Sequence, residues 1–98
     1  MTRRTTFRPQ FEVEITEAAS WYEVQRSGLG RAFLESVDEC VSAITENPFR
    51  FRKVHGETRR APVGRFSYGL IYNVVEDEIV LLACMHSRRH PRRWQDRR

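Results

Sequence analysis

Cysteine and long apolar runs are scarce in this sequence, and their scarcity excludes several classes of protein. The two cysteines, Cys40 and Cys84, lie far apart, so the chain lacks the close spacing of a zinc or dithiol redox motif. We expect both to be small buried apolar side chains, and we expect no metal or other cofactor. No segment approaches the roughly 20 apolar residues of a membrane span, and no secretory signal is visible. These observations favour a cytoplasmic protein without a membrane partner.

Lysine is also nearly absent, because arginine supplies sixteen of the 17 basic residues and Lys53 is the exception. Residues 1–47 carry five arginines against eight acidic residues, whereas residues 48–98 carry eleven arginines and Lys53 against five acidic residues. A GC-rich genome would favour arginine without any functional cause, but it would explain the clustering less well. Guanidinium groups form forked hydrogen bonds with carboxylate or phosphate and stack on aromatic rings. The second half therefore predicts contact with a large anionic partner.

The length of 98 residues predicts one compact domain, residues 1–98, with a single core. Its last part, from about residue 86 to residue 98, is a basic C-terminal tail. This tail contains six arginines together with His86, His90 and Trp94, and it follows directly on an apolar strand. It is thus attached to a rigid element from which it can hold its cations toward a partner.

Apolar periodicity predicts a short strand at residues 5–8 followed by two helices. Pro9 suits the first turn of a helix, and Ser27 and Gly28 end that helix. Apolar side chains at steps of three or four residues line one face of each helix: Phe11, Ile15, Ala18 and Tyr22 in the first, and Leu29, Phe33, Val37, Val41 and Ile44 in the second. Asn47 and Pro48 stop the second helix. So short a connection predicts an antiparallel helical hairpin.

From Phe49 onward the period changes to two, which predicts a sheet. Residues 49–54 are a loop or an edge strand, and residues 58–63 are a strand whose Pro62 argues for an edge or a bulge. Residues 68–75 and 79–85 are the two strongest strands, joined by a turn at residues 76–77. The expected fold class is α+β, in the order β-α-α-β-β-β, with the helical hairpin packed on a small, mainly antiparallel, twisted sheet.

The last strand is apolar on both faces. Strict alternation places Ile79, Leu81, Ala83 and Met85 on one face and Val80, Leu82 and Cys84 on the other. A helical hairpin can cover only one of them. Either the N-terminal strand and the tail bury the second face, or it is an exposed patch that a partner covers. We favour the partner, because a helix of another chain laid in such a groove is a common solution.

The order and spacing of several short segments resemble the RelE/ParE superfamily of bacterial type II toxin–antitoxin toxins, and within it the ParE-like, plasmid-stabilisation branch. These segments are FRP at residues 7–9, EAASWYE at 17–23, GLGRAFL at 28–34, NP at 47–48, RR at 59–60, RFSYGLIY at 65–72 and HSRRHPRRW at 86–94. The resemblance implies a toxin that arrests growth of its own cell unless a cognate antitoxin is bound in a hetero-oligomer. It also implies the RelE/ParE-like fold.

Two mechanisms divide that superfamily, and this sequence has features of both. RelE-like members cut messenger RNA on the ribosome. In that case His86 would serve as acid or base, and Arg60, Arg65 and Arg89 would hold the phosphate. The tyrosine that several such nucleases carry after the last strand is missing. ParE-like members instead poison DNA gyrase without being enzymes.

We favour gyrase, with target binding by Arg60, Arg65, His86, Arg89 and Trp94, and leave the nuclease as the alternative. A non-catalytic nucleic-acid-binding module is a weaker third hypothesis. Trp21 and Tyr22 are adjacent on the first helix, about 100° apart, so one is expected to pack inward and the other to lie at the rim. Together with Leu82 and Cys84 they are the expected antitoxin-binding residues.

Overall fold

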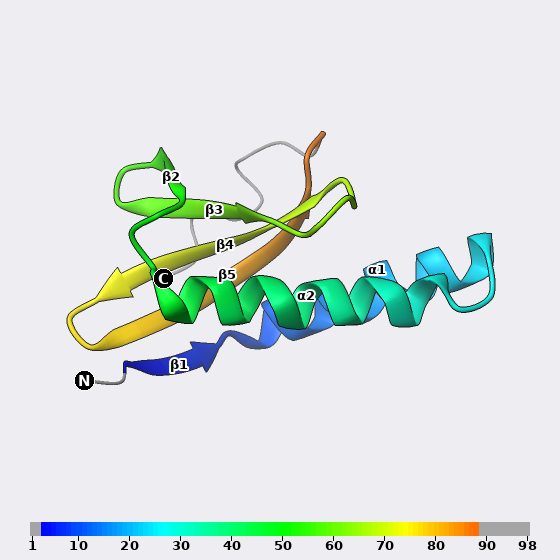
Figure 1. Cartoon of the computed structure of the whole chain (residues 1–98), viewed down its shortest axis with the longest axis horizontal. Helices are drawn as coiled ribbons and strands as arrows, with labels where there is room; N and C mark the ends of the chain where they lie inside the picture. Colours follow the sequence, from blue (N-terminus) through cyan, green and yellow to red (C-terminus); the bar gives the residue numbers. More distant parts are fainter. Residues whose placement is uncertain (1–2, 89–98) are drawn as a thin grey trace.

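The structure is a computed structural model that describes residues 3–88. Its elements follow one another as β1 (Arg4–Phe7), α1 (Pro9–Gln25), α2 (Leu29–Glu46), β2 (Arg52–His55), β3 (Thr58–Pro62), β4 (Tyr68–Val75) and β5 (Glu78–His86) (Figure 1). The expected α+β order is confirmed, and the segment that the sequence left between loop and edge strand contains β2. Neither helix is long and apolar enough to cross a membrane, within the described range.

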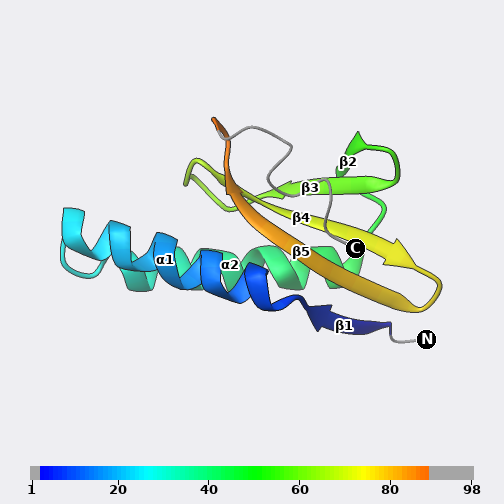
Figure 2. The same ribbon diagram turned by 180° about the vertical axis from the view of Figure 1, so that it is seen from behind.

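The five strands form one mixed sheet in the order β1-β5-β4-β3-β2. β1 pairs with β5 in parallel, and the other neighbouring strands are antiparallel. Both helices lie on the same face of this sheet, as the two opposite views show (Figures 1 and 2). Pro62 belongs to an inner strand, but the register of β2 with β3 stops at Arg60, so the proline lies where β3 is locally an edge.

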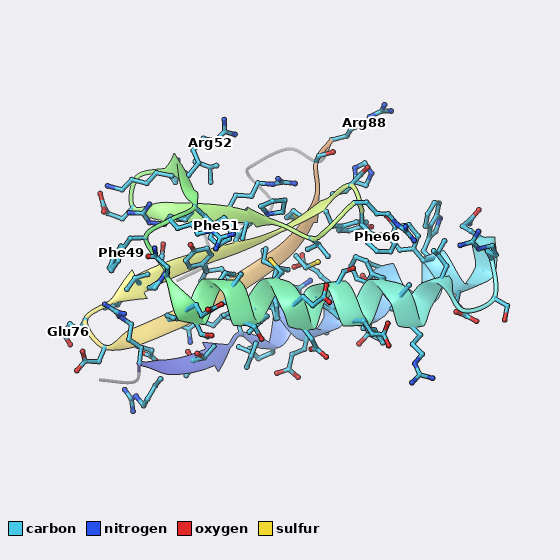
Figure 3. All side chains as sticks on the ribbon, in the orientation of Figure 1. Phe49, Phe51, Arg52, Phe66, Glu76 and Arg88 are labelled. Atoms are coloured by element: carbon cyan, nitrogen blue, oxygen red, sulfur yellow. The ribbon has the colours of Figure 1, made fainter. Side chains whose placement is uncertain are left out.

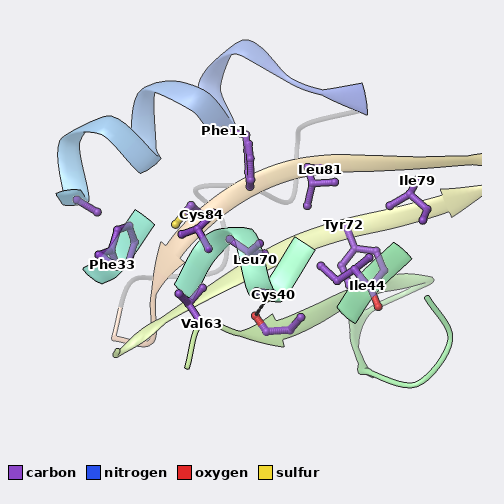
Figure 4. Packing of buried hydrophobic residues seen from close by; sticks show 13 residues of the cluster. Phe11, Phe33, Cys40, Ile44, Val63, Leu70, Tyr72, Ile79, Leu81 and Cys84 are labelled. Atoms are coloured by element: carbon purple, nitrogen blue, oxygen red, sulfur yellow. Dashed lines mark hydrogen bonds between the residues drawn. The ribbon is translucent and has the colours of Figure 1, made fainter. Parts of the chain in front are cut away.

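The main core fills the space between the helical hairpin and the sheet (Figure 4). Its fully buried large side chains include Phe11 from α1, Phe33 and Ile44 from α2, and Leu70 and Tyr72 from β4. Burial of each such side chain contributes about 1.5–3 kcal/mol to folding. The Tyr72 hydroxyl donates a buried hydrogen bond of 2.7 Å to the carbonyl of Pro48, which ties the end of the hairpin to the sheet.

A bulge in β5 changes which side chains share a face of the sheet. Ile71 pairs with Ala83 and the next residue, Tyr72, pairs with Leu81, so Leu82 is an extra residue in β5. Leu82 and Ala83 therefore both pack on the side away from the helices, here called the outer face. The faces that strict alternation predicted for the residues after Leu82 were therefore wrong, because one extra residue moves every later side chain to the opposite face of the sheet.

The outer face is buried, and the expectation of an exposed apolar patch there is wrong. Its apolar cluster comprises Ile71, Val80, Leu82, Ala83 and Met85, none of which is more than 6% exposed, with Val54 packed against them. An open patch of this size would leave apolar area in water at a cost of about 25 cal/mol per Å². Leu82, an expected antitoxin contact, is accordingly buried in this cluster.

Candidate functional site

A cleft of about 670 Å³ opens between α1 and the C-terminal end of β5; we call it the α1–β5 cleft. Its described lining residues are Glu14, Glu17, Ala18, Trp21, Tyr22, Ser67, Tyr68, Cys84 and His86. The cleft thus brings together three of the four expected antitoxin contacts with one expected target-binding residue. Leu82, the fourth expected antitoxin contact, belongs to the outer-face cluster.

The cleft exists because β1 is short. β1 pairs with β5 no further than Leu81, and the Arg8 N–H then donates to the Leu81 carbonyl at 3.0 Å. Beyond that point α1 runs beside β5 in place of a strand. The Glu14 carboxylate reaches across and accepts a hydrogen bond of 3.0 Å from the Cys84 N–H. One wall of the cleft is therefore α1, which this hydrogen bond holds against the edge of β5.

Aromatic rings in edge-on or tilted contact form a continuous chain from the core to the cleft. The ring of Tyr22 lies 5.2 Å from that of Phe33, 6.0 Å from that of Tyr68 and 5.1 Å from that of Trp21, measured between centroids. Burial raises the pKa of the Tyr22 hydroxyl, while a hydrogen bond with the Ser67 backbone opposes the shift. Tyr22 thus packs inward and Trp21, 57% exposed, lies at the rim, as the sequence predicted.

His86 is half-buried at the end of β5 and is held from two sides. Its ring meets that of Tyr68 edge-on, with centroids 5.2 Å apart, and its Nδ1 accepts a hydrogen bond of 3.1 Å from the Arg88 N–H. A neutral imidazole that accepts at Nδ1 carries its proton on Nε2. With Nδ1 occupied by the Arg88 N–H, Nε2 is the ring nitrogen that His86 has left for a partner.

Arg60 lies on the opposite face of the sheet from His86. It pairs with Ile71 and so projects from the outer face, where its guanidinium covers Gly69 so closely that a Cβ there would collide with it. Burial lowers the pKa of Arg60, and the Arg52 cation lowers it further. The bulge at Leu82 causes the separation, because without it His86 would follow Val80 onto the outer face.

The remaining expected cations are dispersed. Arg65 is exposed in the connection between β3 and β4, with its guanidinium 6.0 Å from the ring centroid of Phe66. Arg89 and Trp94 lie outside the described residues. Arg52 and Arg88, which the sequence analysis did not single out, project from the side of the sheet away from the helices (Figure 3). Arg52 pairs with Arg60 across β2 and β3 and so shares the outer face with it, whereas Arg65 lies in a loop and His86 lines the α1–β5 cleft.

A second apolar surface, the interhelix groove, was missed by sequence reasoning. It lies between the two helices, has a volume of about 670 Å³, and is lined by Phe7, Phe11, Glu12, Ile15, Thr16, Leu34, Val37, Asp38, Val41 and Ser42. Phe7 and Leu34 are each 43% exposed here. The sequence did contain a sign of this groove. Leu34 is apolar and follows the core residue Phe33, so it widens the apolar stripe of α2.

Neither cysteine is suited to thiolate chemistry. Burial raises the pKa of Cys40 to about 11 and that of Cys84 to about 12, and the Glu14 carboxylate adds to the shift of Cys84. Both are buried and free. Across residues 3–88, no three His, Cys, Asp or Glu side chains come together in a way that could hold a metal ion.

The family model described as the ParE toxin of the type II toxin–antitoxin system, parDE, matches residues 6–91. No curated protein sequence matches. Among solved structures, the chromosomal ParDE system from P. aeruginosa superposes with a TM-score of 0.77 at 11% identity, covering 87% of this chain and 96% of that one.

Two further similar structures come from RelE–RelB complexes. The RelBE2 complex from Mycobacterium tuberculosis has a TM-score of 0.62 at 15% identity, covering 88% of this chain and 92% of that one. The archaeal RelE–RelB complex from Pyrococcus horikoshii OT3 has a TM-score of 0.60 at 20% identity, covering 92% and 100%. At these identities the structures show a shared fold, whereas the family model covers most of the sequence. This chain therefore belongs to the ParE toxin family of type II toxin–antitoxin systems.

Proposed function

We propose that this ParE-family toxin arrests growth by poisoning DNA gyrase, without catalysing a reaction itself, and that a cognate antitoxin neutralises it. The observation that carries the choice of target is the placement of Arg60 and His86 on opposite faces of the sheet. Because gyrase acts on chromosomal DNA, the toxin would work in the cytoplasm.

The alternative, ribosome-dependent cleavage of mRNA, requires a converged site. A general acid or base must lie within hydrogen-bond reach of the group whose proton it transfers, while cations neutralise the same phosphate. His86 lines the α1–β5 cleft, whereas Arg60 covers Gly69 on the outer face. This arrangement favours binding over catalysis. The third hypothesis, a nucleic-acid-binding module, would need a basic groove, but neither the α1–β5 cleft nor the interhelix groove has an arginine or lysine among its described lining residues.

The proposed gyrase contacts are Arg60, Arg65, His86, Arg89 and Trp94. The two described arginines among them supply forked donors on different surfaces, and His86 supplies Nε2. A protein partner can contact several surfaces at once, whereas a single scissile phosphate cannot. The placement of Arg60, Arg65 and His86 on different surfaces therefore suits a large protein target.

The proposed antitoxin contacts are Trp21, Tyr22 and Cys84 at the α1–β5 cleft, together with the interhelix groove. The similar P. aeruginosa, M. tuberculosis and P. horikoshii structures belong to toxin–antitoxin systems, which supports a cognate antitoxin for this chain. The interhelix groove offers half-exposed Phe7 and Leu34 to an amphipathic segment. Leu82 is left out of this proposal because it packs in the outer-face cluster, whereas Cys84, although buried, lines the cleft.

The test is a supercoiling assay with purified gyrase. The toxin at micromolar concentration should block supercoiling and accumulate cleaved DNA, and added antitoxin should restore activity. Arg65→Gln should weaken the block, whereas Arg31→Gln is the matched control because Arg31 forms an exposed ion pair with Glu35 on α2.

Two outcomes would contradict the proposal. Unaffected gyrase together with codon-positioned mRNA cuts that vanish in His86→Ala would favour the nuclease. Unaffected gyrase with DNA or RNA binding that falls steeply as salt rises would favour the nucleic-acid-binding module.

A further inference from the structure

We propose that the α1–β5 cleft is a receptor for one cationic side chain, an arginine or a lysine, presented by the antitoxin. The identity of the partner rests on the proposed function, whereas the recognition of a cation by the cleft does not. The antitoxin segment that docks here would therefore carry a basic residue, and not only the apolar and acidic residues that a basic toxin would attract.

The charge of the cleft is opposite to that of the chain as a whole. The protein carries a net charge of +4, yet none of the described lining residues is arginine or lysine, and two of them are glutamates. Glu14 already accepts the Cys84 N–H. Glu17 is exposed, lies one turn further along α1, and takes part in neither ion pair described for residues 3–88. A carboxylate in this position attracts a cation.

An aromatic face lies next to that carboxylate. Trp21 follows Glu17 by four residues on α1, so the two side chains are neighbours on one helix face. The indole is 57% exposed, and it meets the ring of Tyr22 edge-on with centroids 5.1 Å apart. A cation over a tryptophan face gains about 0.5–1 kcal/mol at an exposed site. A guanidinium can stack on the indole while it hydrogen-bonds with the carboxylate.

The size and rigidity of the cleft suit such a guest. Ligand sites have volumes of about 300–1,000 Å³, and the cleft has about 670 Å³. Its back wall, Tyr22 and Tyr68, is held by ring contacts with Phe33 at 5.2 and 5.4 Å. The cleft therefore needs little reorganisation to bind, which lowers the cost of association.

The first experiment measures cation binding without any partner. Trp94→Phe leaves Trp21 as the single tryptophan of the full-length chain, so its fluorescence reports on the cleft. The probe is N-acetyl-arginine amide at constant ionic strength. N-acetyl-citrulline amide, a neutral side chain of nearly the same shape, is the matched control ligand.

The arginine probe should change Trp21 emission saturably and the citrulline probe should not. Glu17→Gln should weaken the response about two- to five-fold, the range of an exposed ion pair. Glu39→Gln, an exposed carboxylate on α2 outside the cleft, should leave it unchanged. Equal responses to both probes, or equal affinities of the Glu17 and Glu39 variants, would overturn the cation site. If the arginine probe gives a response only after Arg92 and Arg93 are changed to Gln, the chain's own tail occupies the cleft. That result would overturn the proposal that an antitoxin side chain binds there.

The second experiment measures antitoxin affinity by calorimetry with the same two variants. Glu17→Gln should bind antitoxin about two- to five-fold more weakly than Glu39→Gln, and the difference should disappear when the antitoxin's basic residue is replaced. If arginine binds but the two variants hold antitoxin equally, the antitoxin is not the carrier of the cation. If the arginine probe binds but the toxin neither inhibits gyrase nor binds antitoxin, the proposed function fails and the cation site stands.

Discussion

The Glu14 carboxylate of α1 accepts a hydrogen bond of 3.0 Å from the backbone N–H of Cys84 in β5, 70 residues away in the sequence. β1 has ended by this point, so the glutamate satisfies a backbone donor that no strand on that side satisfies. The bond holds α1 against β5 and so fixes the width of the α1–β5 cleft.

Glu14→Ala should lower the free energy of unfolding by about 1–3 kcal/mol, because it removes a charged acceptor from a part-buried N–H. Glu14→Gln should lose less, since its amide oxygen can still accept. Urea denaturation measures both, with Glu39→Ala as the control for loss of an exposed helical carboxylate. Equal stabilities of the Glu14→Ala and Glu39→Ala proteins would show that the bond contributes nothing.

Glu23 closes the helical hairpin by accepting hydrogen bonds from the backbone of the next helix. Its Oε1 accepts from the Gly28 N–H at 3.1 Å and from the Gly30 N–H at 3.0 Å. The Gly28 bond, followed by the Gly30 bond, lowers the pKa of Glu23 below its ordinary value. Any Cβ at Gly30 would come within 2.6 Å of the Ala19 carbonyl oxygen, so this approach of the helices requires glycine.

The lowered pKa predicts an acid-dependent stability. A carboxyl group whose folded pKa is depressed stabilises the protein above its unfolded pKa, and this contribution is lost as pH falls through the folded value. Glu23→Gln should therefore melt at a lower temperature than wild type at neutral pH and at nearly the same temperature in acid. Thermal melts between pH 2.5 and 7 measure this. A constant difference at all pH values would refute the assignment.

Gly69 makes room for the guanidinium of Arg60 on the outer face. Because a Cβ at residue 69 would collide with that group, Gly69→Ala should displace Arg60 and destabilise the fold. In the Arg60→Ala background the same change should cost much less, since the side chain that blocks the methyl group is gone. We expect a coupling energy of about 0.5–3 kcal/mol in a double-mutant cycle. Additive effects of the two changes would mean that the residues do not interact.

Local sequence patterns were sufficient to predict the helices and the order of helices and strands along the chain, because the step of three or four residues and the turn signals act within a few residues. They were not sufficient for β5. Both faces of that strand are apolar, so no polar residue marks where alternation is reversed, and the bulge at Leu82 depends on pairing with β4.

The candidate site was harder to predict for the same reason. Arg60 and His86 look like members of one basic site in the sequence, and strict alternation would have left both on the outer face. The bulge turns His86 toward α1 and the cleft. The Glu14 bond to Cys84 and the interhelix groove depend on how α1 packs against other elements, and periodicity within one helix carries no such information.

Tyr72 is fully buried, and burial raises the pKa of its hydroxyl to about 12. Because the hydroxyl has a higher pKa in the folded state than in the unfolded state, its neutral form stabilises the fold. This contribution is fully present below the unfolded pKa, near 10, and is lost as pH rises toward 12. Tyr72→Phe loses the hydrogen bond to Pro48, so it should cost about 1–2 kcal/mol at neutral pH. It should also remove part of the alkaline instability. Denaturant titrations at pH 7 and pH 11 measure both effects, and an unchanged pH dependence in the variant would contradict them.

The interhelix groove predicts that neutralisation and toxicity can be separated. Leu34 is 43% exposed and lines the interhelix groove, whereas His86 lines the α1–β5 cleft, so Leu34→Glu should leave the fold and gyrase inhibition intact. A carboxylate buried under an apolar antitoxin segment should weaken the complex about tenfold or more, since tenfold corresponds to only about 1.4 kcal/mol. Val24→Glu, the same kind of change at an 83% exposed α1 position outside the groove, is the control. Co-expression growth assays should show arrest that antitoxin relieves for Val24→Glu but not for Leu34→Glu. Full rescue of the Leu34 variant would mean that the antitoxin binds elsewhere.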